Sequence, residues 1–250
     1  MNNRETAAVR LTVAKDGSGA CKTVQEAVDA LPEYSRERKE ILIKKGIYKE
    51  VVRILATKPF VTLIGESATD TVITYDNYAG KEKEGGGEYG TSGSATVFIY
   101  ADHFRAENLT FENSFDRTKT DTAGTQAVAV YSKGSRISFK HARFLGRQDT
   151  LFVNDGEQYF DNCYIEGDVD FIFGGARAVF DQCRIHSVDR GSATNNGYIT
   201  AASTHITKRF GFFIVNCTLT SDAADGTVYL GRPWHPGGDP DAIASVLYKN

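Results

Sequence analysis

The feature that most constrains the fold is an internal repeat of about twenty residues. Around Cys163 the chain reads YFDNCYIEG (159–167), and around Cys183 it reads VFDQCRIHS (179–187). The same frame recurs around Cys217, around Ala142 and, more weakly, around Leu109. A period near twenty residues, with short β-rich segments joined by turns, is typical of a solenoid whose coils bury their inner faces only against their neighbours. We therefore predict an all-β fold, a parallel β-helix.

The repeat also predicts which side chains point inward. Each copy has an apolar residue three positions before the cysteine column and another two positions after it. These positions predict two inward ladders, Phe139, Phe160, Phe180 and Ile214, and Phe144, Ile165, Ile185 and Leu219. The residues just before the column predict a polar stack at a corner, made of Asn108, Asn162, Gln182 and Asn216. Cys163, Cys183 and Cys217 are expected to be small buried thiols, with a disulfide between neighbouring coils as the alternative.

The chain shows no linker, so we expect residues 1–250 to form one solenoid domain. Thr23 and Glu26 have the spacing of a capping box, and the apolar residues that follow lie on one helical face, which predicts a short helix that caps the N-terminal end. The glycine-rich stretch within residues 77–93 is expected to be a loop that extends from one coil. At the other end, the sequence after residue 234 is short, and we expect the C-terminal end to be incomplete.

Composition excludes several classes of function. A net charge of −3 gives no basic footprint for nucleic acid. No apolar run is long enough to span a membrane, and residues 1–6 lack the apolar core of a signal peptide. The cysteines form no C-x-x-C pair and the five histidines are scattered, so they do not suggest a zinc site, and we predict no cofactor.

Two aspartates, Asp149 and Asp170, lie in consecutive copies of the repeat. Alignment of Gly134 with Gly156 places residues 126–130 beside residues 148–152, so that Gln126, Gln148 and the two aspartates become vertical neighbours. Adjacent parallel strands lie about 4.8 Å apart, so the two carboxylates should not both be charged, and one should hold a proton. An ionised carboxylate that attacks and a protonated one that donates a proton suit a two-step mechanism, with the amides as oxyanion donors.

Solenoids commonly carry Asp and Asn ladders that satisfy turns, so the aspartate column also fits a purely structural role. Arg232 and the only tryptophan, Trp234, favour a functional site, because they stand within three positions of each other around Pro233. A guanidinium can keep one aspartate ionised and oriented, and an indole can stack on a sugar ring. On its own, Trp234 would fit the core equally well.

With these residues in place, the chain resembles the pectin methylesterase (pectinesterase) family. Five segments look like that family's signature motifs in their usual order, namely GIYKE (46–50), QAVA (126–129), QDTL (148–151), DFIFG (170–174) and LGRPW (230–234). DGSG (16–19) followed by KTVQEAV (22–28) is similar to the family's start. The resemblance implies a right-handed parallel β-helix that hydrolyses the C6 methyl esters of polygalacturonate to pectate and methanol, without a metal.

The resemblance also implies roles for individual residues. Asp170 is expected to be the nucleophile, Asp149 the acid that protonates methanol and then activates water, and Gln148 the oxyanion donor. Gln126 is expected to assist and to bind substrate, and Arg232 to hold Asp170 and contact the substrate. The remaining substrate contacts implied are Trp234, Thr91, Val169 and Phe173.

The expected partner is methyl-esterified homogalacturonan or its oligomers, bound by a monomer. The family is usually secreted, whereas residues 1–6 carry no export signal, so the compartment is left open. Two alternatives remain: a non-catalytic β-helical carbohydrate-binding module, and another pectin-active β-helix enzyme, either a pectate lyase or a polygalacturonase. Lyases generally need Ca²⁺ and a basic proton abstractor, and the glycoside hydrolases cluster several aspartates around water; neither needs Gln126 together with Gln148 and Asp149.

Overall fold

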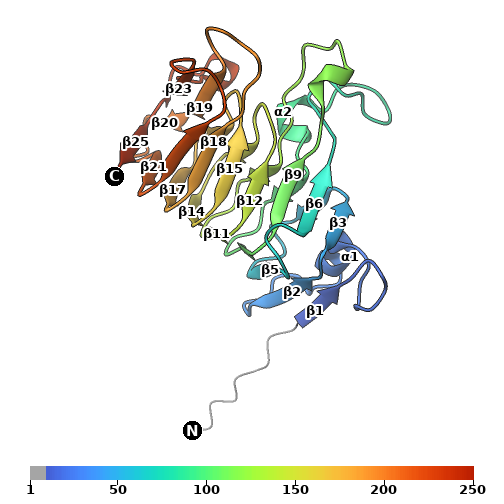
Figure 1. The fold of residues 1–250 in the computed structure, drawn as a ribbon. Coiled ribbons are helices and arrows are strands. Elements are labelled where there is room, and N and C mark those ends of the chain that lie inside the picture. The colour runs from blue at the N-terminus through green and yellow to red at the C-terminus, as the bar shows by residue number, and fades with distance from the viewer. Residues whose placement is uncertain (1–9) are drawn as a thin grey trace.

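The chain folds into a parallel β-helix, as the repeat predicts. A computed structural model describes residues 10–250, and the segment on which the absence of a signal peptide was predicted lies outside them. Three parallel sheets run along the molecule, so that successive coils stack from the N-terminal to the C-terminal end (Figure 1). Within the described residues, no helix is long and apolar enough to cross a membrane.

Each sheet takes one strand from almost every coil. The nine-stranded sheet, here called the long sheet, contains β1 (Arg10–Val13), β2 (Lys39–Ile43), β5 (Val61–Gly65), β8 (Arg105–Glu107), β11 (Ile137–Lys140), β14 (Glu157–Asp161), β17 (Arg177–Asp181), β21 (Phe212–Val215) and β25 (Val246–Lys249). The corner sheet contains β3 (Gly46–Lys49), β6 (Thr71–Tyr75), β9 (Thr110–Asn113), β12 (Arg143–Leu145), β15 (Tyr164–Gly167), β18 (Arg184–Ser187) and β22 (Thr218–Ser221). The site sheet contains β4 (Val52–Ile54), β7 (Val97–Ile99), β10 (Val130–Ser132), β13 (Leu151–Val153), β16 (Ile172–Gly174), β19 (Gly197–Ala202) and β23 (Val228–Gly231).

The remaining elements are short. They are the antiparallel pair β20 (Thr204–His205) and β24 (Ala242–Ile243), the helices α1 (Val24–Asp29) and α2 (Gly90–Gly93), and the 3₁₀ turns η1 (Arg117–Lys119) and η2 (Pro236–Gly238).

Both predicted apolar ladders are present. Phe139 pairs with Phe160, and Phe160 pairs with Phe180, which in turn pairs with Ile214. The rings of Phe160 and Phe180 stack with their centroids 4.5 Å apart. The second ladder runs along the corner sheet in the predicted register, although its last member, Leu219, is 38% exposed because β22 is the edge strand of that sheet.

The predicted polar stack occupies the corner between the long sheet and the corner sheet. Asn162 has a φ of 52° and Gln182 a φ of 55°, and the same left-handed conformation occurs at Asn108, His141 and Asn216. Asparagine tolerates this region better than most residues with a side chain, which explains why amides recur at this point of the repeat.

The cysteine column is buried, as expected. Cys163 and Cys183 belong to the main core, and Cys217 packs against it from the less covered C-terminal coil. Arg184 donates its backbone N–H to the carbonyl of Cys163 at 2.9 Å, which places the two cysteines in adjacent coils. All four cysteines are free thiols, so the disulfide alternative is wrong.

The N-terminal helix forms as predicted, but its capping differs in one bond. Thr23 accepts from the backbone N–H of Glu26 at 3.1 Å. The Glu26 carboxylate, however, accepts from Lys22 rather than from Thr23. The Glu50 carboxylate accepts hydrogen bonds from the backbone N–H groups of Val24 and Gln25. A residue that directly follows β3 therefore also caps the first turn of the helix.

The register predicted from the turn glycines is wrong by one residue. Val130 pairs with Leu151, twenty-one positions later. Strand β11 pairs with β14 at the same offset, since Ile137 pairs with Gln158. Gly134 and Gly156 are twenty-two positions apart and are therefore not equivalent. Gln126 accordingly does not pair directly with Gln148. Asp149 and Asp170, which share the offset of Leu151 and Ile172, do lie in register.

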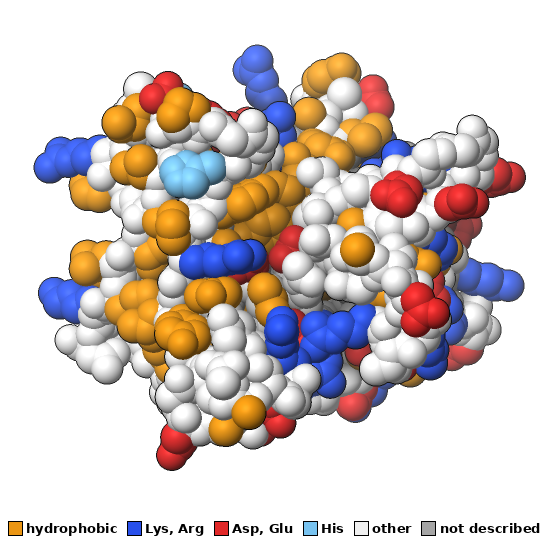
Figure 2. All heavy atoms as spheres, turned by 90° about the horizontal axis from the view of Figure 1, so that it is seen from above, with side chains coloured by type: hydrophobic (Ala, Val, Ile, Leu, Met, Phe, Trp, Pro, Cys, Tyr) orange, Lys and Arg blue, Asp and Glu red, His pale blue; other side chains and the backbone are white. Residues whose placement is uncertain are grey.

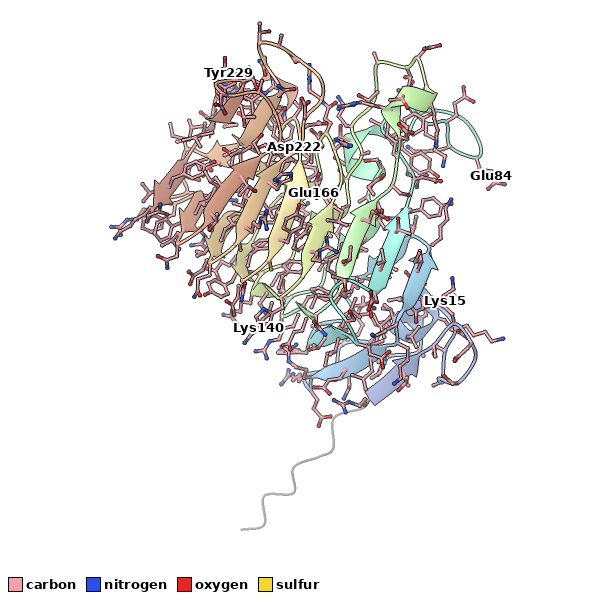
Figure 3. The ribbon with its side chains drawn as sticks, in the orientation of Figure 1. Lys15, Glu84, Lys140, Glu166, Asp222 and Tyr229 are labelled. Carbon is pink, nitrogen blue, oxygen red and sulfur yellow. The ribbon has the colours of Figure 1, made fainter. Side chains whose placement is uncertain are left out.

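The irregular segments gather at one side of the solenoid. The loop at 77–93 contains α2, and a second loop at 114–127 contains η1. Figure 3 labels Glu84 at the tip of the first loop and Tyr229 on the last described coils, and the loops at both ends rise on the same side. Figure 2 views this side and shows a hollow with hydrophobic side chains between two raised parts of the surface.

Candidate active site

The site lies where the outer face of the site sheet meets the turns that precede its strands. An outward column of aromatic residues runs along this face, and its members pair in the order Phe98, Tyr131, Phe152, Phe173. They form a second apolar cluster, separate from the solenoid core. This cluster gives the candidate site an apolar floor.

Asp149 and Asp170 stand two positions before β13 and β16, in adjacent coils. The backbone N–H of Asp149 donates to the carbonyl of Val169 at 3.0 Å, which ties the two turns together. Both aspartates have left-handed backbone conformations, with φ of 66° and 53°. Nine other described non-glycine residues share this conformation, and aspartate tolerates it, so it sets the direction of the two side chains without by itself marking a functional site.

Arg232 holds Asp170 in a two-point ion pair. The Arg232 Nε donates to one carboxylate oxygen of Asp170 at 2.8 Å, and Nη2 donates to the other. A guanidinium offers only donors, so both oxygens of Asp170 act as acceptors, an arrangement that suits an ionised carboxylate. The pair raises the pKa of Arg232, chiefly through the hydrogen bonds to Asp170. The guanidinium also lies over the ring of Tyr198, 5.0 Å from its centroid.

Asp149 is buried, and no cation of residues 10–250 lies within hydrogen-bond reach of its side chain. Burial raises the pKa of its carboxyl group well above the ordinary value, and the negative charge of Asp170 raises it further. Arg232 acts in the opposite direction but more weakly. The surroundings of the two aspartates therefore differ, and those of Asp149 favour its protonated form more than an ordinary aspartate's do.

The two predicted glutamines are near the aspartates, but they are held differently. The side-chain oxygen of Gln148 accepts from the hydroxyl group of Thr125 at 3.1 Å, which turns its NH₂ group away from that loop. Among the described residues, this NH₂ group has no acceptor. Gln126 is half-buried. Its backbone carbonyl accepts from the N–H of Ala79 at 2.8 Å, whereas its side chain forms no hydrogen bond with other described residues.

Trp234 lies across the apolar floor and is half-buried. Its ring contacts Phe173 edge-on, with centroids 5.4 Å apart, and lies 6.0 Å from Phe152. Val169 is buried between the two catalytic candidates, and Phe173 is fully covered. Of the predicted contact residues, Trp234 therefore has a partly open face, whereas Val169 and Phe173 shape the site mainly from below.

Thr91 is the most distant of the predicted residues. It lies in α2, and the preceding residue, Gly90, donates to Ala79, which in turn donates to Gln126. These two bonds place α2 one step beyond Gln126 along the face. The Thr91 side chain is half-buried and forms no hydrogen bond with other described residues, so the structure leaves its predicted role untested.

Sequence reasoning missed four neighbours of the site: Tyr198 beside Arg232, Thr125 beside Gln148, and the ion pair between Asp168 and Arg117. The pair joins residues fifty-one positions apart, which no repeat position connects. Between residues 10 and 250, no three His, Cys, Asp or Glu side chains come together in a way that could hold a metal ion.

Comparison with known proteins decides the family. The model of the family described as Pectinesterase matches residues 10–238. The chain belongs to the pectinesterase family. It is 38% identical to pectinesterase 31 of Arabidopsis thaliana over 90% of this chain and 69% of that protein. It is 39% identical to pectinesterase A of Dickeya chrysanthemi over 92% of this chain and 69% of that protein.

Solved structures agree with this assignment. A pectin methylesterase variant in complex with a hexasaccharide superposes with a TM-score of 0.89, at 37% identity over 95% of this chain and 76% of that one. The pectin methylesterase from carrot gives a TM-score of 0.82, at 32% identity over 98% of this chain and 83% of that one. The chain spans between 56% and 69% of the length of the first curated relatives that it matches. Pectinesterases are carboxylic ester hydrolases, and the pair of unequal aspartates is the part of this chain to which such chemistry would be assigned.

Proposed function

We propose that this chain is a pectin methylesterase, which hydrolyses the C6 methyl esters of homogalacturonan or its oligomers to free carboxylates and methanol. The observation that carries the proposal is the division between the two aspartates. Arg232 bonds both oxygens of Asp170 and favours its ionised form, while burial raises the pKa of Asp149 and favours its protonated form. A nucleophile and a proton donor thus lie in adjacent coils, within a family of ester hydrolases.

In the first step, a carboxylate oxygen of Asp170 attacks the ester carbonyl carbon, and the carbonyl oxygen becomes an oxyanion. The free NH₂ group of Gln148 is the donor placed to stabilise this charge, assisted by Gln126. Collapse of the tetrahedral intermediate breaks the bond to the methoxy oxygen, which takes the proton of Asp149 and leaves as methanol. The product of this step is an anhydride between Asp170 and the galacturonate carboxyl group.

In the second step, Asp149 is a carboxylate and acts as a general base. It removes a proton from water, and the resulting hydroxide attacks the anhydride carbonyl of the sugar. The C–O bond to Asp170 breaks, which releases ionised Asp170 and the galacturonic acid, while Asp149 keeps the proton that it took from water. The acid product then loses its remaining proton to solvent. Arg232 remains paired with Asp170 through both steps and stabilises it as nucleophile and as leaving group. Trp234, at the open edge of the apolar floor, supplies a stacking face for a sugar ring, and residues of α2 such as Thr91 would contact a more distant sugar.

The test is methanol release from highly esterified pectin, with and without a chelator, by the wild-type protein and by Asp170→Asn. We expect chelator-independent methanol release by the wild type, and none by a variant whose amide cannot form the anhydride. A folded Asp170→Asn protein with near-normal activity would contradict the nucleophile assignment. Sugar binding without methanol release would instead support the carbohydrate-binding alternative, and Ca²⁺-dependent formation of unsaturated products would support a lyase.

A further inference from the structure

A third carboxylate is buried beside the catalytic candidates and has no role in the proposed reaction. The side chain of Asp168 is fully buried. One of its oxygens accepts the backbone N–H of Val169 at 2.7 Å and a weaker bond from Arg117 at 3.3 Å. The other oxygen accepts from Nη2 of Arg117 at 2.5 Å. Asp168 therefore fixes the start of the turn that presents Asp170, and Arg117 is its only cation among the described residues.

Arg117 reaches Asp168 from a different coil. It belongs to the 114–127 loop, which leads into β10, whereas Asp168 precedes β16. In the site sheet, β13 lies between these two strands. The ion pair therefore spans the coil that contains Gln148 and Asp149, and the backbone N–H of Asp168 also donates to the carbonyl of Arg147 in that coil at 3.1 Å. Asp168 is thus bonded both to the loop, through Arg117, and to the coil that contains Gln148 and Asp149, through Arg147.

The same loop holds the amide of Gln148. The hydroxyl group of Thr125 donates to the Gln148 side-chain oxygen at 3.1 Å. An amide has one acceptor oxygen and one NH₂ group, so occupying the oxygen determines where the two donor hydrogens point. Thr125 stands between Gly124 and Gln126, whose carbonyls accept from the backbone N–H groups of Gly80 and Ala79. The ion pair of Arg117 with Asp168 anchors the same loop nearer its start.

We propose that Arg117 is a positioning residue for ester hydrolysis: through its ion pair with Asp168, it fixes the 114–127 loop so that Thr125 holds the Gln148 amide in its oxyanion-binding orientation. The inference rests on the proposed esterase activity. Arg117 itself does not contact the reacting atoms. Its effect is transmitted by the loop, and the interaction that it supports is made only when the oxyanion forms.

This placement predicts a distinctive kinetic signature. An interaction made only in the transition state changes kcat and leaves KM nearly unchanged. Loss of one oxyanion donor lowers kcat by about 10²- to 10³-fold, so a misplaced donor should cost roughly 10- to 100-fold. Arg117→Met should therefore lower kcat by this amount at nearly constant KM. Thr125→Val, which removes only the hydroxyl donor, should shift kcat in the same way.

A double-mutant cycle with Gln148→Ala tests the proposal. If Arg117 acts through the Gln148 amide, Arg117→Met and Thr125→Val should have little further effect once that amide is absent, because residues that act as a unit are not additive. Lys119→Met is the matched control, because Lys119 lies in the same loop and pairs only with the exposed Asp116. This control should leave kcat and KM unchanged.

Three precautions separate a failure of the positioning role from a failure of the proposed function or of folding. Methanol release by the wild type is measured first, since its absence would contradict the proposed function rather than the positioning role. All variants are then assayed well below their melting temperatures, with activity expressed per folded molecule. If Arg117→Met does not fold, Arg117→Lys replaces it in the cycle: its ammonium keeps the charge but cannot bond both carboxylate oxygens, so a smaller fall in kcat is expected. Equal losses in the wild-type and Gln148→Ala backgrounds, or a lower melting temperature with unchanged kcat, would overturn the proposal.

Discussion

Asp149 and Asp170 are identical side chains with unequal surroundings, and the proposed chemistry depends on that inequality. Asp170 has a side chain that is 10% exposed and a guanidinium bonded to both of its oxygens. Asp149 is buried, no cation among the described residues pairs with it, and the charge that acts on it most strongly is the negative one of Asp170. When the pair holds one proton, these surroundings favour its residence on Asp149.

The raised pKa of Asp149 predicts that Asp149→Asn alters the pH dependence of stability. A carboxyl group whose folded-state pKa is raised binds more protons in the folded than in the unfolded state, so its contribution to stability falls as pH rises from the ordinary aspartate value to the raised one. The asparagine variant lacks this decline. Between pH 4 and 7, we expect the free energy of unfolding of Asp149→Asn to rise relative to that of the wild type, while methanol release is lost or nearly lost.

Urea unfolding at several pH values measures this difference. Asp161→Asn provides the control, because Asp161 is a partly exposed carboxylate on the long sheet, away from the site. A constant difference between Asp149→Asn and wild type over this pH range would contradict the assignment of the proton to Asp149.

Trp234→Ala separates a sugar-stacking role from a core role. Because Trp234 is half-buried at the edge of the apolar cluster, its truncation should cost less than the 3–5 kcal/mol typical of a fully buried aromatic residue, about 1–2 kcal/mol. The KM for polymeric pectin should rise several-fold. Phe173→Ala, which removes a fully covered ring of the same cluster, is the stability comparison and should cost more. If both variants lose equal stability, Trp234 is a core residue.

At the scale of single elements, the corner between the long sheet and the corner sheet depends on backbone conformation. Asn162 has a φ of 52°, so glycine there should be nearly neutral, whereas alanine should destabilise the protein by about 1–2 kcal/mol. Tyr164, two residues later in β15, provides the opposite case, because in a strand glycine should cost more than alanine. Thermal unfolding of the four variants checks both orders. The same order at both positions would contradict a conformational origin for the polar stack.

The sequence predicted the parts of the fold that repeat and missed the parts that do not. The Phe139 ladder and the amide corner could be predicted because each coil places the same residue type at the same position. The offset between β10 and β13 was predicted wrongly, because Gly134 and Gly156 occupy different positions in their turns. Turn glycines are required by local backbone geometry and need not mark equivalent points of the register.

The candidate site shows the same division. Asp149 and Asp170 could be found from their shared repeat position, and Arg232 from its motif, although sixty-two positions separate Arg232 from Asp170. Arg117 and Thr125 could not be found, because they lie in a loop whose path is set by tertiary contacts rather than by periodicity. The motif identifies Gln148 but not the orientation of its side-chain amide. The hydrogen bond from Thr125 gives a structural reason for that orientation.

At the scale of the whole molecule, the protein is a stack of coils in which each coil contacts mainly its neighbours. In the long sheet, the strands from β1 to β25 lie side by side in the same order as along the chain. The Phe160 ring stacks on Phe139 at 4.9 Å and on Phe180 at 4.5 Å, so the core itself is a row of nearest-neighbour contacts. Stability in such an architecture is close to a sum of the stabilities of single coils and of the interfaces between them. We propose that residues 10–250 nevertheless unfold as one domain, because a single apolar core continues from Val13 to Ile214.

Two double-mutant cycles test this description. Phe160→Leu and Phe180→Leu alter rings in direct contact and should be non-additive by at least about 0.5 kcal/mol. Leu63→Ala and Phe180→Leu alter the same sheet at β5 and β17, four strand spacings or roughly 19 Å apart, and should add within about 0.3–0.5 kcal/mol. Each variant should unfold in a single transition that has the same midpoint by far-UV and near-UV circular dichroism. Strong coupling of the distant pair would mean that energy is shared beyond neighbouring coils, and separate transitions would mean that the solenoid contains more than one cooperative unit.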